Sequence, residues 1–281
     1  METGLTHTVT EEDLAIIRKA KHDMVNLSWA IKGVNKLGGA IESGSKLIPD
    51  KMISLIQRST ENILLKILKT NLLTLKKNKE FKKPSKRTYK AIVTASGAGA
   101  GFFGSTTGVG TAIFISEMTV TTKFLMRTIL DIARSQGENI YTAEAQMECL
   151  KVFALGGSSE SDDGLETSYY LTRAGLTSAL GNVSASSIKA IINSTVAGAS
   201  AMGSNVITKF ITQIASRLSI LITEKAIAQA VPIAGAVGGG SINFIFINHF
   251  QKMATAHFSI RRLERKYGEE LVRKAYEKTS I

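Results

Sequence analysis

The chain has 281 residues, of which 44% are hydrophobic, and we expect one globular domain with an extension. Its formal net charge of +12 predicts attraction to polyanions, either nucleic acid or the anionic face of a membrane. The single cysteine, Cys149, excludes an intramolecular disulfide and a cysteine-based zinc cluster within one chain, and we expect it to be a small buried hydrophobe.

The N-terminal part of the chain predicts two amphipathic helices. The opening residues METGLTHTVTEED show no basic segment followed by an apolar one, so we expect a cytoplasmic protein without a Sec-type signal peptide. Thr10 precedes three acidic residues and predicts the N-cap of a helix that runs to about Asn35. Pro49 begins a second predicted helix over roughly 50–75. We expect the two helices to form a hairpin, and we assign residues 1–44 to an N-terminal helical extension and 45–281 to a helical domain.

Residues 76–90 form a strongly basic linker within this domain. Eight of these fifteen residues are Lys or Arg, and residues 91–116, which follow directly, contain no charge. Basic residues beside an uncharged segment are typical of docking on anionic lipid, at about 1 kcal/mol per cation near the surface. A solvated loop around Pro84 is the alternative. Nucleic acid is an unlikely partner, because only Phe81 and Tyr89 in this linker could stack on bases.

Two segments without Asp, Glu, Lys or Arg, 91–116 and 226–251, carry glycines four residues apart. Residues at this spacing share one helix face, where a second helix can approach closely. Each segment fits a glycine-rich (GxxxG) helical hairpin, either buried or inserted reversibly in a membrane, and a conventional span is an alternative for 91–116. Apolar residues recur at helical spacing elsewhere, so we predict an all-α, compact multi-helix domain. The expected helix-packing residues are Gly97, Gly101, Gly104, Gly108, Gly235 and Gly239.

The residues that end the first hairpin and continue beyond it are similar to those of the second. FISEMTVTTKFLMRTILDIARSQGE aligns with FINHFQKMATAHFSIRRLERKYGEE at a shift of about 131 residues with one gap. The alignment puts Glu117 opposite His249, and Gly137, a predicted helix C-cap, opposite Gly268. If it reflects a duplication, the two glycine-rich units pack around a pseudo-two-fold axis.

Three blocks of the sequence resemble the EcsC family, named for a protein encoded beside an ABC transporter: EMTVTTKFLMRTILDIARSQGE, CLKVFALGG with SSESDDGLETSYYLTRAGL, and PIAGAVGGGSINFIFINHFQKMATAHFSIRRLERKYG. The resemblance covers roughly residues 45–275, and the last block is its most specific part. It implies an association with transport or secretion and no agreed biochemical activity. The first forty residues and the basic linker are outside the pattern.

Several polar residues stand inside otherwise apolar segments. Glu117, Asp131, His249 and His257 are weak candidates for a zinc- or manganese-type hydrolytic site. The two histidines are ~12 Å apart along one helix, too far to share a metal without a break in that helix. The sequence shows no HExxH, CxxC, Walker A or GxSxG pattern, so we expect no catalytic residues, metal or cofactor. We expect structural roles for the histidines and interhelical ion pairs among Arg127, Asp131, Arg262 and Glu264.

The leading hypothesis is a non-enzymatic protein, peripheral to the inner face of the membrane, that docks on anionic lipid and assists an ABC transporter or secretion component. The first alternative is a membrane-inserting toxin or effector that permeabilises a target bilayer. The second is a metal-dependent hydrolase. The sequence names no lipid, transporter or oligomeric state. The residues expected at the membrane are Lys76, Lys77, Lys82, Lys83, Lys86, Arg87, Phe102, Phe103, Phe244 and Phe246.

Overall fold

The computed structural model describes residues 8–25, 50–74, 86–101, 108–155, 168–181, 201–230 and 235–280. Within these ranges every regular element is an α-helix, which confirms the predicted all-α fold. The helices are α1 (Glu11–Val25), α4 (Asp50–Thr74), α5 (Lys86–Gly101), α6 (Gly108–Ser135), α7 (Ala143–Leu155), α8 (Ser168–Leu180), α10 (Ala201–Ala230), α11 (Gly235–Tyr267) and α12 (Glu269–Lys278).

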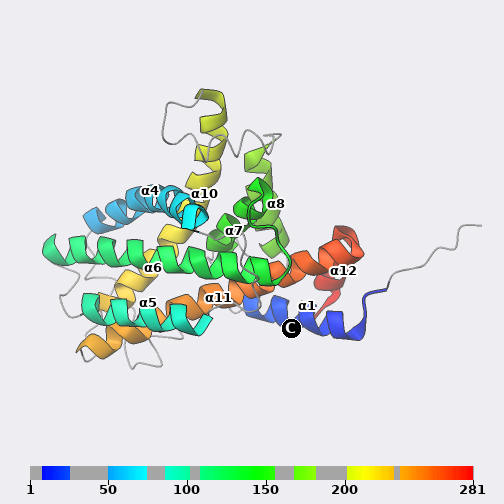
Figure 1. Cartoon of the computed structure of the whole chain (residues 1–281), viewed down its shortest axis with the longest axis horizontal. Coiled ribbons are helices and arrows are strands. Elements are labelled where there is room, and N and C mark those ends of the chain that lie inside the picture. The colour runs from blue at the N-terminus through cyan, green and yellow to red at the C-terminus, as the bar shows by residue number, and fades with distance from the viewer. Residues whose placement is uncertain are drawn as a thin grey trace, which may run out of the picture.

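The long helix α11 is the centre of the fold. It packs against α5, α1, α6, α7, α10 and α12, and Figure 1 shows it crossing the molecule from the side of α5 to that of α1 and α12. A second group of contacts joins α10 to α4, α7 and α8. The core therefore surrounds the middle of α11, whose buried apolar side chains are Ile242, Phe246, Ile247, Phe250, Met253, Ala254, Phe258, Ile260 and Leu263.

The predicted start signals of the first two helices are confirmed. The Asp13 amide donates to the Thr10 hydroxyl at 3.3 Å, which is an N-cap contact, and α4 begins directly after Pro49. The expected hairpin between them is wrong, because α1 packs on α11 and α12 whereas α4 packs on α6 and α10. An apolar stripe shows that a helix face is buried but not which helix covers it. Residues 26–49 lie outside the described residues.

The first glycine-rich segment contains the end of one helix and the start of the next. α5 ends at Gly101 and α6 begins at Gly108, and the two helices lie side by side. The Tyr89 hydroxyl donates to Asp131 at 2.7 Å across the pair. This arrangement confirms a helical hairpin and excludes one continuous span over residues 91–116. Phe102, Phe103 and Gly104 lie outside the described residues.

The second glycine-rich segment likewise holds the end of α10 at Ala230 and the start of α11 at Gly235. Both α6 and α11 are followed within two residues by a glycine with positive φ, 85° at Gly137 and 89° at Gly268. The packing of the two halves differs, because α5 lies along α11 whereas α10 packs mainly on α4, α8 and α7. The duplication therefore stays a hypothesis supported by the helix ends alone.

One helix in the described part of the chain is long and apolar enough to cross a membrane. It is the stretch Val206–Gln229 of α10, with a mean hydropathy of 1.3, and half of that window is buried inside the protein. Length and composition are weak evidence of membrane association, because the core helix of a water-soluble protein has the same properties. Lys225, inside this stretch, is bound within the fold as described below.

Candidate functional site

A carboxylate in the middle of the fold is neutralised by residues from several helices. Glu117 of α6 accepts two hydrogen bonds from the Lys225 amine of α10, at 2.7 and 2.8 Å. Thr121 donates to the same carboxylate at 2.6 Å, and the Asn243 amide of α11 donates to it at 2.7 Å. The Asn243 amide also donates to the Val93 carbonyl of α5 at 2.8 Å. This inner cluster therefore joins α6, α10 and α11 through a buried ion pair and its hydrogen bonds, and Asn243 links it to α5.

The electrostatics of the inner cluster favour an ionised pair. Burial raises the pKa of the Glu117 carboxyl, but Lys225 and the two hydrogen-bond donors outweigh burial and lower it. Burial lowers the pKa of Lys225, and Glu117 opposes that effect. The Lys225 amine also lies 5.2 Å from the centre of the Phe246 ring, a cation–π distance. Each charge is thus balanced by the other, which suits a structural role.

A second buried cluster contains a histidine that faces a carboxylate inside the core. Nε2 of His257 lies 3.1 Å from Glu148, although the two groups are not aligned for a hydrogen bond. The Tyr169 hydroxyl lies 3.0 Å from Nδ1 of the same ring. Glu148 also pairs with Lys151 at 2.8 Å and lies 3.6 Å from Arg261. The outer cluster, as we call it, joins α7, α8 and α11.

The surroundings of the His257 imidazole favour its neutral form. Burial lowers the pKa of His257, and Glu148 does not compensate for it. Burial raises the pKa of Glu148, but His257, Lys151 and Arg261 outweigh burial and lower it. Because Lys151 and Arg261 already balance the carboxylate, a third positive charge would be unfavourable there. We place the ring proton on Nε2, which faces the carboxylate, so that Tyr169 donates to Nδ1.

The end of α11 is fixed by further ion pairs. Arg261 donates to Glu138 at 2.8 Å and to Glu144 at 3.0 Å. Arg265 also pairs with Glu138 and donates to the Gln136 carbonyl at 2.6 Å. These contacts hold the ends of α6 and α11 together near Gly137.

The surface along α5 and α11 gathers positive charge. The Lys86 amine donates to the Thr255 hydroxyl at 3.0 Å, and the Lys90 amine donates to Asn248 at 2.7 Å. Lys90 lies 5.2 Å from the centre of the Phe244 ring, and Phe244 is 46% exposed. Burial and Lys90 lower the pKa of Lys86, and burial and Lys252 lower that of Lys90. We call Lys86, Lys90, Lys252 and Phe244 the basic seam.

The four residues considered for a metal site do not form one. Glu117 binds Lys225, Asp131 accepts from Tyr89, and His257 lies in the outer cluster. His249 is buried with its ring 5.3 Å from that of Phe250. Among the described residues no three His, Cys, Asp or Glu side chains are placed to hold a metal ion. The carboxylates of Glu117 and Asp131 bind other side chains of the protein instead of presenting open positions to a metal ion.

The ion pairs predicted between the two halves stay a prediction, and the structure shows contacts of Glu264 and Asp131 with other residues. Glu264 pairs with Arg173 of α8 at 2.6 Å, and the Tyr170 hydroxyl also donates to it. Asp131 accepts from Tyr89, and the hydrogen bond with burial raises the pKa of that tyrosine to about 12. Arg262 is exposed on α11. The expected buried cysteine is confirmed, since Cys149 is fully buried.

Some of the predicted membrane residues lie on the surface, and one lies in the core. Phe244 is exposed in the basic seam, whereas Phe246 is buried on the other side of α11. Arg87 is exposed at the start of α5. Phe246 is therefore a core residue, because it lies two positions from Phe244 and so on a different helix face. The other four predicted linker lysines, Lys76, Lys77, Lys82 and Lys83, lie outside the described residues.

Sequence patterns missed most members of the two clusters. Lys225 was detectable as a cation between the apolar positions Ile222 and Ala226, and Lys151 as one inside CLKVFALGG. Tyr169 is the first residue of a tyrosine pair, which gave no sign of its partner. Lys225 is 108 positions from Glu117, and Tyr169 is 88 positions from His257. Only the fold therefore identifies these partners.

The comparisons with known proteins place the chain in one family. No curated protein and no solved structure matches it. The model of the EcsC protein family matches residues 11–263, a range that includes α1 as well as the α5, α6, α10 and α11 hairpins. The match therefore covers most of the chain, and the protein belongs to the EcsC protein family.

Proposed function

We propose that this protein is a peripheral membrane protein that docks on anionic lipid through the basic seam and the linker at 76–90. The observation that carries the proposal is a row of three neighbouring lysines, Lys86, Lys90 and Lys252, in which Lys90 lies against the exposed ring of Phe244. Cations with an adjacent exposed aromatic ring suit the interface of an anionic bilayer, where lipid phosphates balance the charge and the ring enters the headgroup layer.

Among the described residues, few negative charges lie close enough to neutralise the seam. Lys86 and Lys90 bind a hydroxyl and an amide oxygen, which carry no charge. Lys252 has a 3.9 Å contact with Asp23, a residue that also pairs with Lys19 at 3.1 Å. Holding like charges together costs free energy unless an anion compensates for it. An anionic surface supplies that compensation, and the sequence directly before α5 holds five further lysines at residues 76–83.

The glycines fit a close contact between α5 and α11 in this proposal. The pairs Val93–Asn243 and Lys90–Asn248 show that the two helices run antiparallel. If this register continues toward the glycine-rich ends, Gly97 and Gly101 would lie opposite Gly239 and Gly235. The glycines would then pack the hairpins together beneath the docking surface.

A variant pair tests this packing role. Gly97→Leu is expected to destabilise the fold by about 1–3 kcal/mol through overpacking. Gly175→Ala is the control, because a Cβ at Gly175 meets no atom within 4 Å, and alanine there is expected to stabilise α8. Equal urea midpoints for Gly97→Leu and the wild type would contradict the packing role.

Vesicle flotation tests the membrane proposal. The wild type is expected to float with vesicles containing phosphatidylglycerol and not with vesicles of phosphatidylcholine alone. The variant Lys90→Gln/Lys252→Gln is expected to bind about tenfold more weakly or worse, because each lysine contributes about 1 kcal/mol near an anionic surface. A second variant replaces Lys76, Lys77, Lys82, Lys83, Lys86 and Arg87 with Gln and is expected to lose binding.

The matched control is Lys51→Gln/Lys209→Gln, which removes the same charge from exposed positions on α4 and α10. It is expected to float like the wild type. Equal binding by the control and the seam variant would reduce the effect to net charge and contradict a defined surface. Binding to RNA in a gel shift without flotation would contradict the choice of lipid.

The proposal places the protein at the inner face of the membrane, where it assists a transporter or secretion complex, an expectation that rests on the family resemblance. Dye release from anionic vesicles separates docking from the membrane-inserting alternative. Docking predicts flotation without release. Release at the protein concentrations that give flotation would favour a toxin or effector that inserts its hairpins.

A further inference from the structure

We propose that the cleft between α1 and α12 binds a single-chain amphiphile with an anionic head. The cleft has a volume of about 500 Å³ and lies between α1 and α12, which are side by side in Figure 1. This volume is in the range of small-molecule sites. The proposal concerns residues other than those of the basic seam and does not rest on the membrane proposal.

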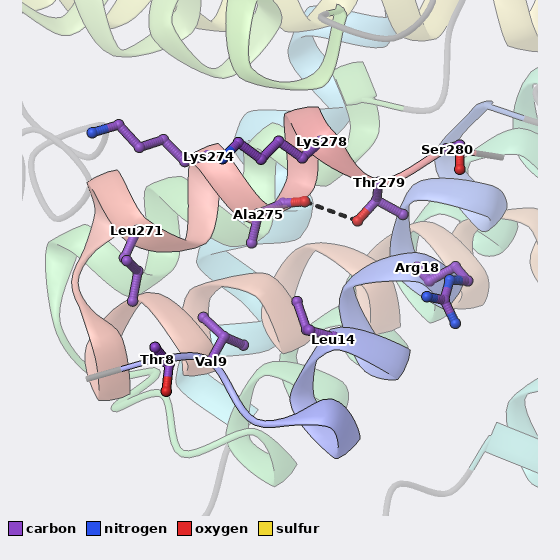
Figure 2. Close-up of a pocket in the computed structure, with 10 residues that line it drawn as sticks. All are labelled: Thr8, Val9, Leu14, Arg18, Leu271, Lys274, Ala275, Lys278, Thr279 and Ser280. Carbon is purple, nitrogen blue, oxygen red and sulfur yellow. Dashed lines mark hydrogen bonds between the residues drawn. The ribbon is translucent and has the colours of Figure 1, made fainter. Parts of the chain in front are cut away.

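The floor of the cleft is apolar. Leu271 and Ala275 point down from α12 toward Val9 and Leu14, as Figure 2 shows. Leu14 and Ala275 are only partly buried, so this floor retains apolar surface exposed to water. An alkyl chain that covers it would gain about 25 cal/mol for each Å² of apolar surface removed from water.

The rim of the cleft is cationic and rich in hydroxyl groups. Arg18 comes from α1, and Lys274 and Lys278 come from α12, and no carboxylate is among the described side chains that line the cleft. Lys274 pairs with Glu270 at 2.6 Å. Among the described residues neither Arg18 nor Lys278 forms an ion pair. Hydroxyl groups complete the rim at Thr8, Thr279 and Ser280. Two uncompensated cations with nearby hydroxyls suit a phosphate or carboxylate.

The walls of the cleft are fixed by buried contacts. Lys21 of α1 is fully buried and donates to the Thr279 carbonyl at 2.6 Å, which holds α1 against the end of α12. Asp13 accepts from Lys266 and from Tyr267, each at 2.7 Å, which holds the start of α1 against the end of α11. A cleft whose walls are already held in place loses little freedom when a ligand enters.

The test uses decyl phosphate below its micelle concentration, measured by titration calorimetry on the full chain. Decyl phosphate is expected to bind, whereas inorganic phosphate and decyl maltoside, which carry the head or the chain alone, are expected to bind at least about tenfold more weakly. Equal binding of decyl phosphate and decyl maltoside would overturn the proposal that the cleft recognises an anionic head. Equal binding of inorganic phosphate and decyl phosphate would overturn the proposal that the apolar floor binds the alkyl chain.

Variants locate the site. Arg18→Gln/Lys278→Gln removes two exposed charges and is expected to weaken decyl phosphate binding about tenfold or more. Ala275→Leu fills the floor and is expected to weaken it as well. Lys90→Gln/Lys252→Gln, which alters the basic seam, is expected to bind decyl phosphate like the wild type. Unchanged binding by both cleft variants, with thermal unfolding like that of the wild type, would overturn the proposal.

Discussion

The two buried clusters and the basic seam differ in the partners of their charged side chains. Inside, Glu117 is matched by Lys225, and Glu148 is matched by Lys151 and Arg261. On the seam, Lys86 and Lys90 bind uncharged groups and repel neighbouring lysines. In the two buried clusters, charge is therefore balanced by side chains of opposite charge, whereas the basic seam keeps charge that an external anion could balance. This contrast is the main support for a membrane-facing surface.

The largest effect is expected at the inner cluster. Lys225→Met leaves the Glu117 carboxylate buried without its cation and is expected to cost about 3–5 kcal/mol in the free energy of unfolding. The double variant Glu117→Leu/Lys225→Met removes both charges and is expected to recover most of that loss. Urea unfolding measures all three proteins. A loss in the double variant as large as in the single one would contradict a charge-pairing role.

The outer cluster predicts a pH dependence that the inner cluster does not share. Burial holds the pKa of His257 below its ordinary value of 6.5 in the folded protein, so the unfolded chain takes up this proton first as the pH falls. The stability contributed by the neutral ring is therefore present above about pH 6.5 and is lost below it, by at most about 1.4 kcal/mol per pH unit. The carboxylates Glu117 and Glu148 have lowered pKa values, so their contributions are lost only below their ordinary value of 4.5.

Urea unfolding measures how the free energy of unfolding changes with pH. The measurements cover pH 5 to pH 7, a range of about two units that includes the ordinary pKa of histidine. The groups that face His257 are Glu148, Tyr169, Arg173 and Arg261. His257→Gln is expected to flatten the slope, and His22→Gln, at an exposed position on α1, is its control. An unchanged slope in His257→Gln would show that other groups carry the pH dependence.

A smaller effect is expected at Tyr169. Tyr169→Phe removes the hydroxyl that lies 3.0 Å from His257, and its expected cost is about 1 kcal/mol, that of one buried hydrogen bond. The reference substitution is Tyr141→Phe, whose hydroxyl belongs to a partly buried side chain on the connection between α6 and α7. A thermal shift no larger than that of Tyr141→Phe would contradict the hydrogen bond to the imidazole.

The smallest effect on stability is expected at the seam. Lys90→Gln/Lys252→Gln is expected to change the free energy of unfolding by no more than about 0.5 kcal/mol, because surface charges contribute little to folding. Relief of the repulsion between the two lysines would offset the lost hydrogen bond to Asn248. A destabilisation of several kcal/mol would place these lysines with the buried charges and remove the contrast.

Local signals in the sequence predicted the helices well. The Thr10 cap, Pro49 and the glycine at 137 act on their own neighbours, so their effects can be recognised without a fold. Pairing could not be predicted in this way. Glu117 and His257 stood out as polar residues in apolar segments, but their partners Lys225 and Tyr169 lie in other helices. Phe246 shows the same limit, because apolar character alone did not separate a core ring from a surface one.

The most direct test of the central claim is the salt dependence of binding to vesicles that contain phosphatidylglycerol. Docking through the basic seam and linker predicts strong binding at low ionic strength, a steep loss as salt screens the cations, and no binding to phosphatidylcholine. It also predicts a shallower salt dependence for Lys90→Gln/Lys252→Gln than for Lys51→Gln/Lys209→Gln. Failure to bind anionic vesicles at low salt, or binding with the same salt dependence in both variants, would contradict the account.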